Sequence, residues 1–130
     1  VVAEGHRIGN HTFNHLKAWS NPKDYYFSNI EKSTELVHSN LFRHPYGQLF
    51  PWYTKALHKS FNKVVLWDVL SRDYDSTLTP KAVFENVRRN VRPGSLIVFH
   101  DSVKSFKNIQ YALPASIDYL LEHNYTFDIL

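Results

Sequence analysis

The sequence predicts an α/β domain whose strands are mainly parallel. One observation is a pair of short, unbroken apolar runs at residues 64–67 and 95–99, which are typical of strands covered on both faces. The other is that segments with helical spacing separate the strand candidates, an alternation that is typical of parallel sheets and barrels. In such folds the functional groups lie at the carboxyl ends of the strands.

Each element rests on local signals. Residues 1–4 are expected to form the last turn of a helix that Gly5 ends in a left-handed conformation. Thr79 and Pro80 make a good N-cap and first residue of a helix, and Pro114 is placed to open another. We expect strands at residues 7–9, 41–42, 64–67, 95–99 and 125–130, and helices at about 24–39, from Pro51, from Pro80 to a stop at 92–94, and from Pro114 to a left-handed cap at Asn124.

Length and composition exclude several classes of protein. The 130 residues fit one domain, and 43% hydrophobic with 21% charged residues is typical of a globular chain. No apolar run reaches the ~18 residues of a membrane-spanning helix, so no span is expected. The chain has no cysteine, which excludes disulfides and thiolate metal ligands. Because it has no methionine and opens as if inside a helix, we expect residues 1–130 to be an N-terminally truncated single domain.

The charged residues give little support for a nucleic-acid partner. Fifteen Lys and Arg against twelve Asp and Glu leave a net charge of +3, and only Arg88, Arg89 and Arg92 are clustered. Such a cluster at a helix end is usually a solvated face, so we expect no nucleic-acid binding. The eight histidines are more informative, because imidazole is the commonest metal ligand that a cysteine-free chain can offer.

Two polar clusters follow strand candidates in the first half of the chain. His11 and His15 are four residues apart, close enough on one helical turn to share a metal ion. Arg43 precedes a Pro-Tyr-Gly turn at residues 45–47, which can point a backbone N–H into a cleft. The histidines read equally well as ordinary loop residues, and a surface β-turn is the simpler interpretation of the second cluster.

Two further clusters lie in the second half. Asp68 and Asp73 follow the first apolar run, where they can orient a histidine or a metal, although capping acids in a solvated loop are the simpler interpretation. His100 leaves the strand at 95–99, where rigid positioning and partial desolvation suit a general acid or base. A histidine that merely satisfies a strand end fits that pattern as well.

In their order, the four clusters resemble the motifs of the polysaccharide deacetylase family, the NodB-homology domain of carbohydrate esterases. The family's H-[ST]-x-x-H motif is similar to residues 11–15, R-x-P-[YF]-G to residues 43–47, and L-x-x-H to residues 97–100, with Ile for Leu. Its D-x-x-D-W motif resembles residues 67–74, where Tyr74 stands in place of tryptophan. The first motif, a T-F-D-D type with two aspartates, occurs nowhere here, so the chain resembles the carboxyl-terminal portion of the domain.

The resemblance implies a distorted (β/α) barrel, incomplete on its N-terminal side, and a hydrolase that removes N- or O-acetyl groups from a chitin- or peptidoglycan-type polysaccharide. A divalent metal, zinc or alternatively cobalt, nickel or iron, would be held by His11, His15 and a third ligand from the missing upstream segment. In the family, the first motif, which this chain lacks, also supplies the catalytic base. We therefore expect the deacetylase activity of this chain alone to be weak or absent.

The resemblance also implies roles for four residues. His100 would protonate the leaving group, and Asp73 would hydrogen-bond His100 and favour its protonated form. Arg43 would position the missing base, and the Tyr46 backbone N–H would stabilise the oxyanion.

The expected partner is an acetylated glycan. Trp67 and Tyr74 would line its groove, although both can simply pack in the core. A non-catalytic carbohydrate-binding or interaction protein on the same fold is the alternative. The unpaired edges of an incomplete barrel predict an oligomer, a swapped assembly or a companion chain that completes it. The resemblance favours a location at the cell envelope, in the periplasm or outside the cell, because many members of the family act there. The residues of this sequence do not by themselves indicate a compartment.

Overall fold

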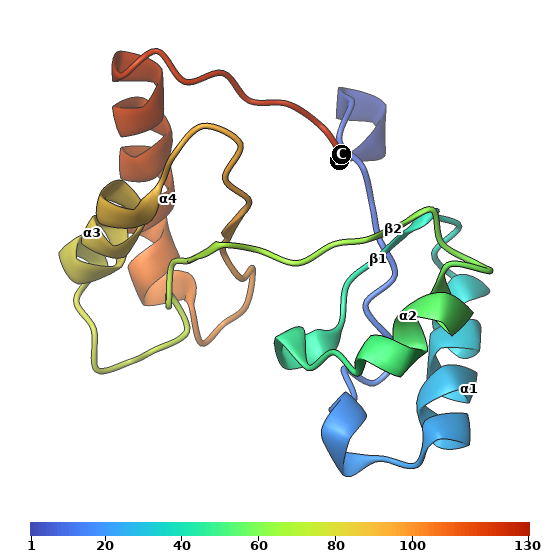
Figure 1. Ribbon diagram of the computed structural model, residues 1–130. Helices are drawn as coiled ribbons and strands as arrows, with labels where there is room; N and C mark the ends of the chain where they lie inside the picture. The colour runs from blue at the N-terminus through green and yellow to red at the C-terminus, as the bar shows by residue number, and fades with distance from the viewer. The chain divides into compact units, whose positions relative to one another are not determined.

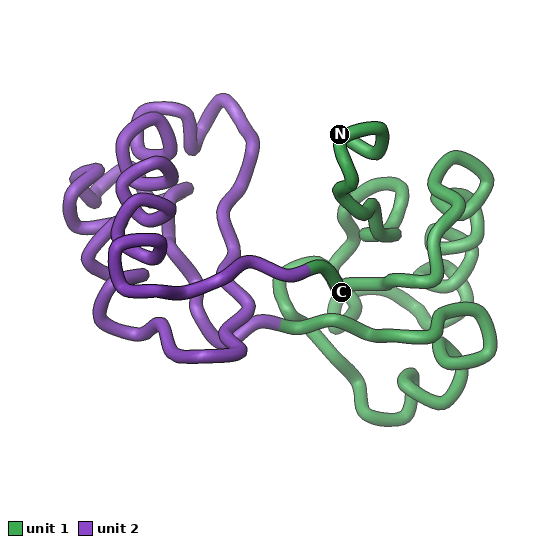
Figure 2. Tube along the Cα trace, turned by 90° about the horizontal axis from the view of Figure 1, so that it is seen from above, with its two compact units in different colours: residues 1–66, 129–130 green, residues 67–128 purple.

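The computed structural model describes residues 1–130, which form two compact units (Figure 2). Unit 1 comprises residues 1–66 and 129–130, and unit 2 comprises residues 67–128. Each unit contains one two-stranded parallel sheet together with helices, so the predicted α/β class with parallel strands is confirmed.

Unit 1 is built on β1 (Leu41–Phe42), which pairs in parallel with β2 (Lys63–Val64). On the other edge of β1, Asn10 forms an isolated parallel bridge to Phe42. The Asn10 N–H donates to the Leu41 carbonyl, and the Val65 N–H donates to the Phe42 carbonyl. Because successive carbonyls of a strand point to opposite edges, these two bonds place β1 between residue 10 and β2. The segments that follow residue 10 and β1 therefore begin next to each other, at the same edge of the sheet.

The helices of unit 1 pack on this sheet through aromatic side chains. They are α1 (Lys23–Thr34) and α2 (Pro51–Leu57) (Figure 1). The short turn η2 (Ala18–Ser20) precedes α1, and the short turn η3 (Pro45–Gly47) lies between β1 and α2. A further short turn, η1, covers Val2–Glu4. The buried core consists of Ala18, Tyr26, Ile30, Phe42, Tyr53, Leu57 and Phe61.

Unit 2 pairs β3 (Val69–Leu70) in parallel with β4 (Ile97–Val98). Its two helices, α3 (Pro80–Asn90) and α4 (Phe106–Glu122), lie against each other (Figure 1). Buried residues recur every four positions, which is the spacing of one helix face. They are Val83 and Val87 on α3, and Asn108, Ala112, Ser116 and Leu120 on α4.

Several predicted boundaries are confirmed by the backbone. The Thr79 hydroxyl accepts a hydrogen bond of 3.2 Å from the Ala82 N–H, as an N-cap should, and Pro80 is the first residue of α3. Gly5 ends η1 with φ 89°, and Asn124 adopts φ 61° after α4.

Other predicted elements are wrong in extent or in kind. Pro114 lies inside α4, which begins eight residues earlier at Phe106. The helix expected to reach residue 39 ends at Thr34, and β2 stops at Val64. Residues 7–9 and 125–130 form no strand. A strand exists only where a neighbouring segment pairs with it, and local sequence does not report the neighbour.

The arginine cluster of the second half is paired with acids. Arg88 and Arg89 both donate to the Glu85 carboxylate. The Nε atom of Arg92 lies 3.3 Å from Oδ2 of Asp68, with which it forms an ion pair. The bond from Arg88 is the main cause that lowers the pKa of Glu85. No helix of the structure is long and apolar enough to cross a membrane.

Candidate active site

The first half of the candidate site lies where residue 10 and β1 end together in unit 1. The Nδ1 atom of His11 is 2.7 Å from the Arg43 carbonyl oxygen. A carbonyl can only accept, so Nδ1 carries the proton and donates it. In the neutral ring the lone pair then lies on Nε2, the atom that a metal would require. The His15 ring meets the His11 ring edge-on with centroids 4.9 Å apart.

The Pro-Tyr-Gly turn of η3 completes this half. The Tyr46 ring packs edge-on against His15, with centroids 4.7 Å apart, and is 55% exposed. Both Tyr46 and Gly47 are left-handed, with φ 59° and 64°. The two predicted clusters of the first half, residues 11–15 and 43–47, are thus brought together in unit 1.

Backbone strain is concentrated in the candidate motifs. Five non-glycine residues have a left-handed φ, and four of them are Thr12, His15, Tyr46 and Arg72; the fifth is Asn124, beyond α4. Each such residue costs about 1–3 kcal/mol, most for β-branched Thr12, and persists only where its surroundings hold it in place. Strain of this kind in a site indicates that the loops are built to hold particular groups.

Two buried asparagines hold the strained loop between His11 and His15. Asn29 on α1 accepts hydrogen bonds of 2.9 Å from the N–H groups of both Phe13 and Asn14 through Oδ1. Asn10 accepts from the Thr12 N–H and donates to the Ile30 carbonyl on α1, each at 3.0 Å. The loop is therefore fastened to a helix by side-chain amides, which replace the partners that a strand would provide.

A buried histidine lies directly under this half of the site. His44 is fully buried, with Nδ1 2.8 Å from the Tyr26 hydroxyl. Burial, helped by the nearby His11, lowers the pKa of His44 to about 4. Its Nε2 atom has no hydrogen-bond partner. His44 is therefore neutral at pH 7. Burial also lowers the pKa of the neighbouring Arg43 guanidinium.

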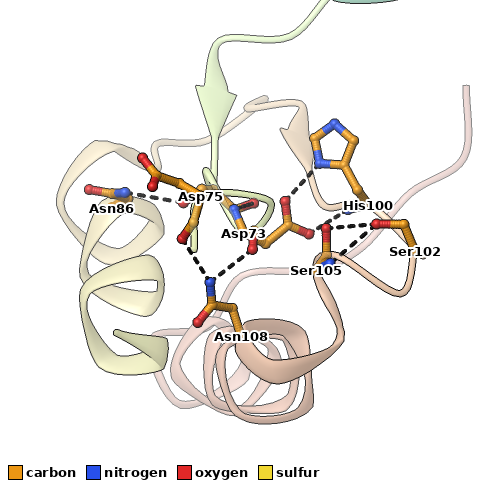
Figure 3. Close-up of polar contacts among 8 residues, drawn as sticks. Asp73, Asp75, Asn86, His100, Ser102, Ser105 and Asn108 are labelled. Atoms are coloured by element: carbon orange, nitrogen blue, oxygen red, sulfur yellow. Dashed lines mark hydrogen bonds and ion pairs between the residues drawn. The ribbon is translucent and has the colours of Figure 1, made fainter. Parts of the chain in front are cut away.

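The second half of the candidate site lies in unit 2, after β3 and β4 (Figure 3). Asp73 is fully buried and accepts two hydrogen bonds from one residue, His100. The His100 N–H donates to Oδ2 at 2.6 Å, and Nδ1 donates to Oδ1 at 2.7 Å. The carboxylate thus fixes both the position of His100 and its tautomer, so that Nε2 is the atom that can exchange a proton with a substrate.

Residues on both helices of unit 2 support this pair (Figure 3). Asn108 on α4 donates to the Asp73 carbonyl at 2.9 Å and to the Asp75 carbonyl at 3.2 Å. Asn86 on α3 donates to the Ser71 carbonyl at 3.1 Å. The loop that carries Asp73 is therefore held from two sides.

The predicted groove residues differ in their surroundings. The Tyr74 ring meets the His100 ring edge-on at 5.1 Å and carries Lys104 Nζ 5.6 Å from its centroid, so it lies beside the proton-transfer pair. Trp67 is half-buried and precedes β3.

The structure brings together one pair of predicted residues within each unit: His11 with His15 in unit 1, and Asp73 with His100 in unit 2. It contains no group of three or more His, Asp or Glu side chains that could hold a metal ion. Two imidazoles are fewer protein ligands than a zinc site usually has.

Sequence reasoning missed the supporting residues. Asn29 and Asn108 lie on helices, far along the chain from the loops that they hold. One signal was available, since asparagine at a buried helix position is unfavourable unless its amide is used. The exposure of two tryptophans, Trp19 and Trp52, was not predicted from the sequence either.

No model of a protein family matches the chain, but curated proteins and solved structures similar to it include several deacetylases. The chain is 31% identical over 105 residues to a chitooligosaccharide deacetylase of Azorhizobium caulinodans, which covers 75% of this chain and 50% of that enzyme. It matches the crystal structure of a peptidoglycan N-acetylglucosamine deacetylase, bound to 4-naphthalen-1-yl-N-oxidanyl-benzamide, with a TM-score of 0.89 and 27% identity. That match covers 98% of this chain and 63% of the other.

A second similar structure is that of a pseudoenzyme of carbohydrate esterase family 4 from Bacillus anthracis. It has a TM-score of 0.79 at 20% identity and covers 97% of this chain and 45% of that one, a likeness that shows the fold alone. The chain spans about half the length of the curated relatives it matches, between 39% and 62%.

Proposed function

Since the homologues and structural neighbours of this chain are polysaccharide and peptidoglycan deacetylases, we propose that it is part of a metal-dependent deacetylase domain. The substrate is an N- or O-acetylated glycan of the chitin or peptidoglycan type. The observation that carries the proposal is the pairing of the motif residues, because His11 meets His15 and Asp73 binds His100 just beyond the ends of parallel strands.

His11 and His15 hold the metal in this proposal, most readily zinc, and a third ligand comes from a segment upstream. When bound, such an ion polarises an acetyl carbonyl and lowers the pKa of a water molecule. The chain's own contribution is orientation: the Arg43 carbonyl fixes the His11 ring, and Asn29 fixes the loop between the histidines. The Arg43 side chain positions the base, which also lies upstream.

His100 acts as the general acid. Hydrolysis adds water to the acetyl carbonyl, breaks the bond from that carbon to nitrogen or oxygen, and requires a proton on the leaving atom. Nδ1 of His100 is held by Asp73, so the proton leaves from Nε2. The Tyr46 N–H, in its left-handed turn, stabilises the oxyanion, an interaction worth about 3 kcal/mol in known enzymes.

The glycan is held in a groove to which Trp67 and Tyr74 contribute, and Tyr74 beside His100 supports this arrangement. In this proposal the complete domain is a distorted (β/α) barrel. The peptidoglycan deacetylases among the relatives favour the cell envelope as its location.

Metal binding and acetate release test the proposal together. We compare this chain, a version extended upstream, and His15→Ala in each, with tetra-N-acetylchitotetraose as substrate and the exposed His58→Ala as control. The extended form is expected to bind zinc tightly and release acetate, the present chain to bind weakly, and the His15 variants not to bind. If no form binds zinc while the His58 variant behaves like its parent, the proposal fails.

A non-catalytic glycan-binding protein on the same fold is the second candidate. The observation behind it is that the structure contains no group of three or more His, Asp or Glu side chains that could hold a metal ion. Glycan binding that is indifferent to a chelator and to His100→Ala, without acetate release by the extended form, would support it over the deacetylase.

A further inference from the structure

Two tryptophans of unit 1 are exposed to an extent that packing does not explain. The exposed fraction is 60% for Trp19, in η2, and 67% for Trp52, at the start of α2. Tryptophan is normally among the more buried residues, because its large apolar surface is costly to leave in water. Two such rings close together therefore indicate a surface that binds something.

The two indoles share one support, Phe50. The Phe50 ring stacks on Trp52, with centroids 4.7 Å apart and 25° between the planes, and lies 6.3 Å from Trp19. Phe50 in turn meets Tyr53, which is buried in the core, edge-on at 5.1 Å. We call Trp19, Phe50 and Trp52 the aromatic ridge. Because its base is tied to the core, its rings are ordered before any ligand arrives, which lowers the entropic cost of binding.

The ridge is continuous with the first half of the candidate site. The backbone N–H of Trp19 donates to the Gln48 side-chain oxygen at 3.5 Å, and Gln48 directly follows the Pro-Tyr-Gly turn. Within that turn Tyr46 packs on His15, and Lys17, two residues before Trp19, lies 5.0 Å from the Tyr46 ring centroid. Gln48 and Lys17 therefore connect the ridge to the exposed Tyr46 ring, which packs on His15.

We propose that the aromatic ridge is a subsite for the sugars of the glycan that flank the reacting unit. The occupant is a chain of N-acetylated hexosamines, whose apolar ring faces suit flat aromatic surfaces while their hydroxyl groups remain in water. No charged side chain belongs to the ridge itself, so it fits a neutral oligosaccharide. The inference rests on the proposed function for its choice of ligand, but it requires neither the metal nor the proton-transfer pair.

Calorimetric titration of this chain with tetra-N-acetylchitotetraose in the presence of a chelator tests the ridge. Trp19→Ala and Trp52→Ala are each expected to weaken binding by about tenfold, the size of effect of losing one aromatic contact. Trp52→Phe is expected to restore most of the affinity, because it restores a ring. Phe127→Ala, which removes an equally exposed ring in unit 2, is the control and is expected to have no effect.

The outcomes separate the ridge from the chemistry. Unchanged affinity in both tryptophan variants, or an equal loss in the Phe127 variant, would overturn the subsite. If the chain binds the tetrasaccharide through the tryptophans and the upstream-extended form releases no acetate with zinc, the subsite holds and the proposed activity fails. If acetate is released and the tryptophan variants bind normally, only the subsite fails.

Discussion

His44 shows how a single buried side chain can make the whole fold sensitive to acid. Its imidazole is neutral in the folded state, because burial opposes the charge and the adjacent His11 adds to the effect. In the unfolded chain the same ring takes up a proton near pH 6.5. Between these values the unfolded state binds more protons, so acid favours unfolding.

The free energy of unfolding is therefore expected to fall as the pH drops below 6.5 towards 4. Between pH 7 and pH 5 the His44 contribution to the loss is roughly 2 kcal/mol, from a folded pKa of about 4. Urea unfolding at both pH values measures it. His44→Phe should flatten the pH dependence by that amount, and His38→Phe, at an exposed position, should leave it unchanged. Equal slopes in the wild type and the His44 variant would contradict the assignment.

Asp73 is the residue on which the second half of the site depends. Replacement by Asn keeps the size but removes the carboxylate that receives both His100 donors. In the extended, active form, Asp73→Asn is expected to lower kcat by at least about 100-fold, the scale of general acid catalysis, with little change in zinc affinity. Glu122→Gln, an exposed neutralisation in the same unit, is the control. A kcat within twofold of the parent would remove Asp73 from the mechanism.

At the scale of elements, α1 and α4 act as supports for loops. Asn29 is expected to contribute to the stability of the loop that it holds, because its side chain accepts from the Asn14 N–H and shares the Phe13 N–H with the Asn29 backbone carbonyl, which remains in an alanine variant. Asn29→Ala should lower the free energy of unfolding by about 1 kcal/mol. It should also speed amide hydrogen exchange at Asn14. Ser28→Ala, on the exposed side of α1, is the control, and unchanged exchange at Asn14 would speak against the anchor.

The start of α3 offers a simpler test. Thr79→Ala removes the acceptor for the Ala82 N–H and is expected to cost about 1 kcal/mol of stability, whereas Thr79→Asp should retain the cap. Lys81→Ala, an exposed change in the first turn, should have almost no effect, as judged by thermal unfolding. A loss shared by the aspartate variant would show that the cap is not the cause.

The elements also show what local sequence can predict. Helix boundaries at Thr79 and Gly5 could be predicted from the sequence, because helix capping and left-handed turns depend on adjacent residues. Pro114 misleads for the opposite reason: a buried stripe on α4, from Asn108 to Leu120, carries the helix through a residue that locally opposes it. Strand pairing, such as that of Asn10 with Phe42, depends on distant neighbours and was not predictable.

The same distinction applies to the candidate site. The residue types and their order pointed to His11, His15, Asp73 and His100, and the structure places these in two contacting pairs. Their roles remain a proposal. Asn29, which holds the loop between the histidines, lies on a helix outside the motifs and belongs to no motif of its own.

For the whole molecule, the two-stranded sheets have a consequence for assembly. A pair of strands is only marginally stable alone, and its outer edges present unpaired backbone groups. We therefore expect this chain, of 15.3 kDa, to associate through those edges or to bind a companion segment. Light scattering at several concentrations measures the mass. A monomer at all concentrations would contradict the expectation, and loss of association on adding an upstream segment in trans would support it.

The side-chain amides that fasten the two loops have a further consequence. A side-chain amide has both a hydrogen-bond acceptor, its oxygen, and a donor, its NH₂ group. Asn29 accepts hydrogen bonds through its oxygen, whereas Asn108 donates them through its nitrogen. Aspartate keeps the oxygen and loses the donor. Natural variants of this protein should therefore tolerate aspartate at position 29 but not at position 108, so that the evolutionary record of each position reveals the direction of its bonds.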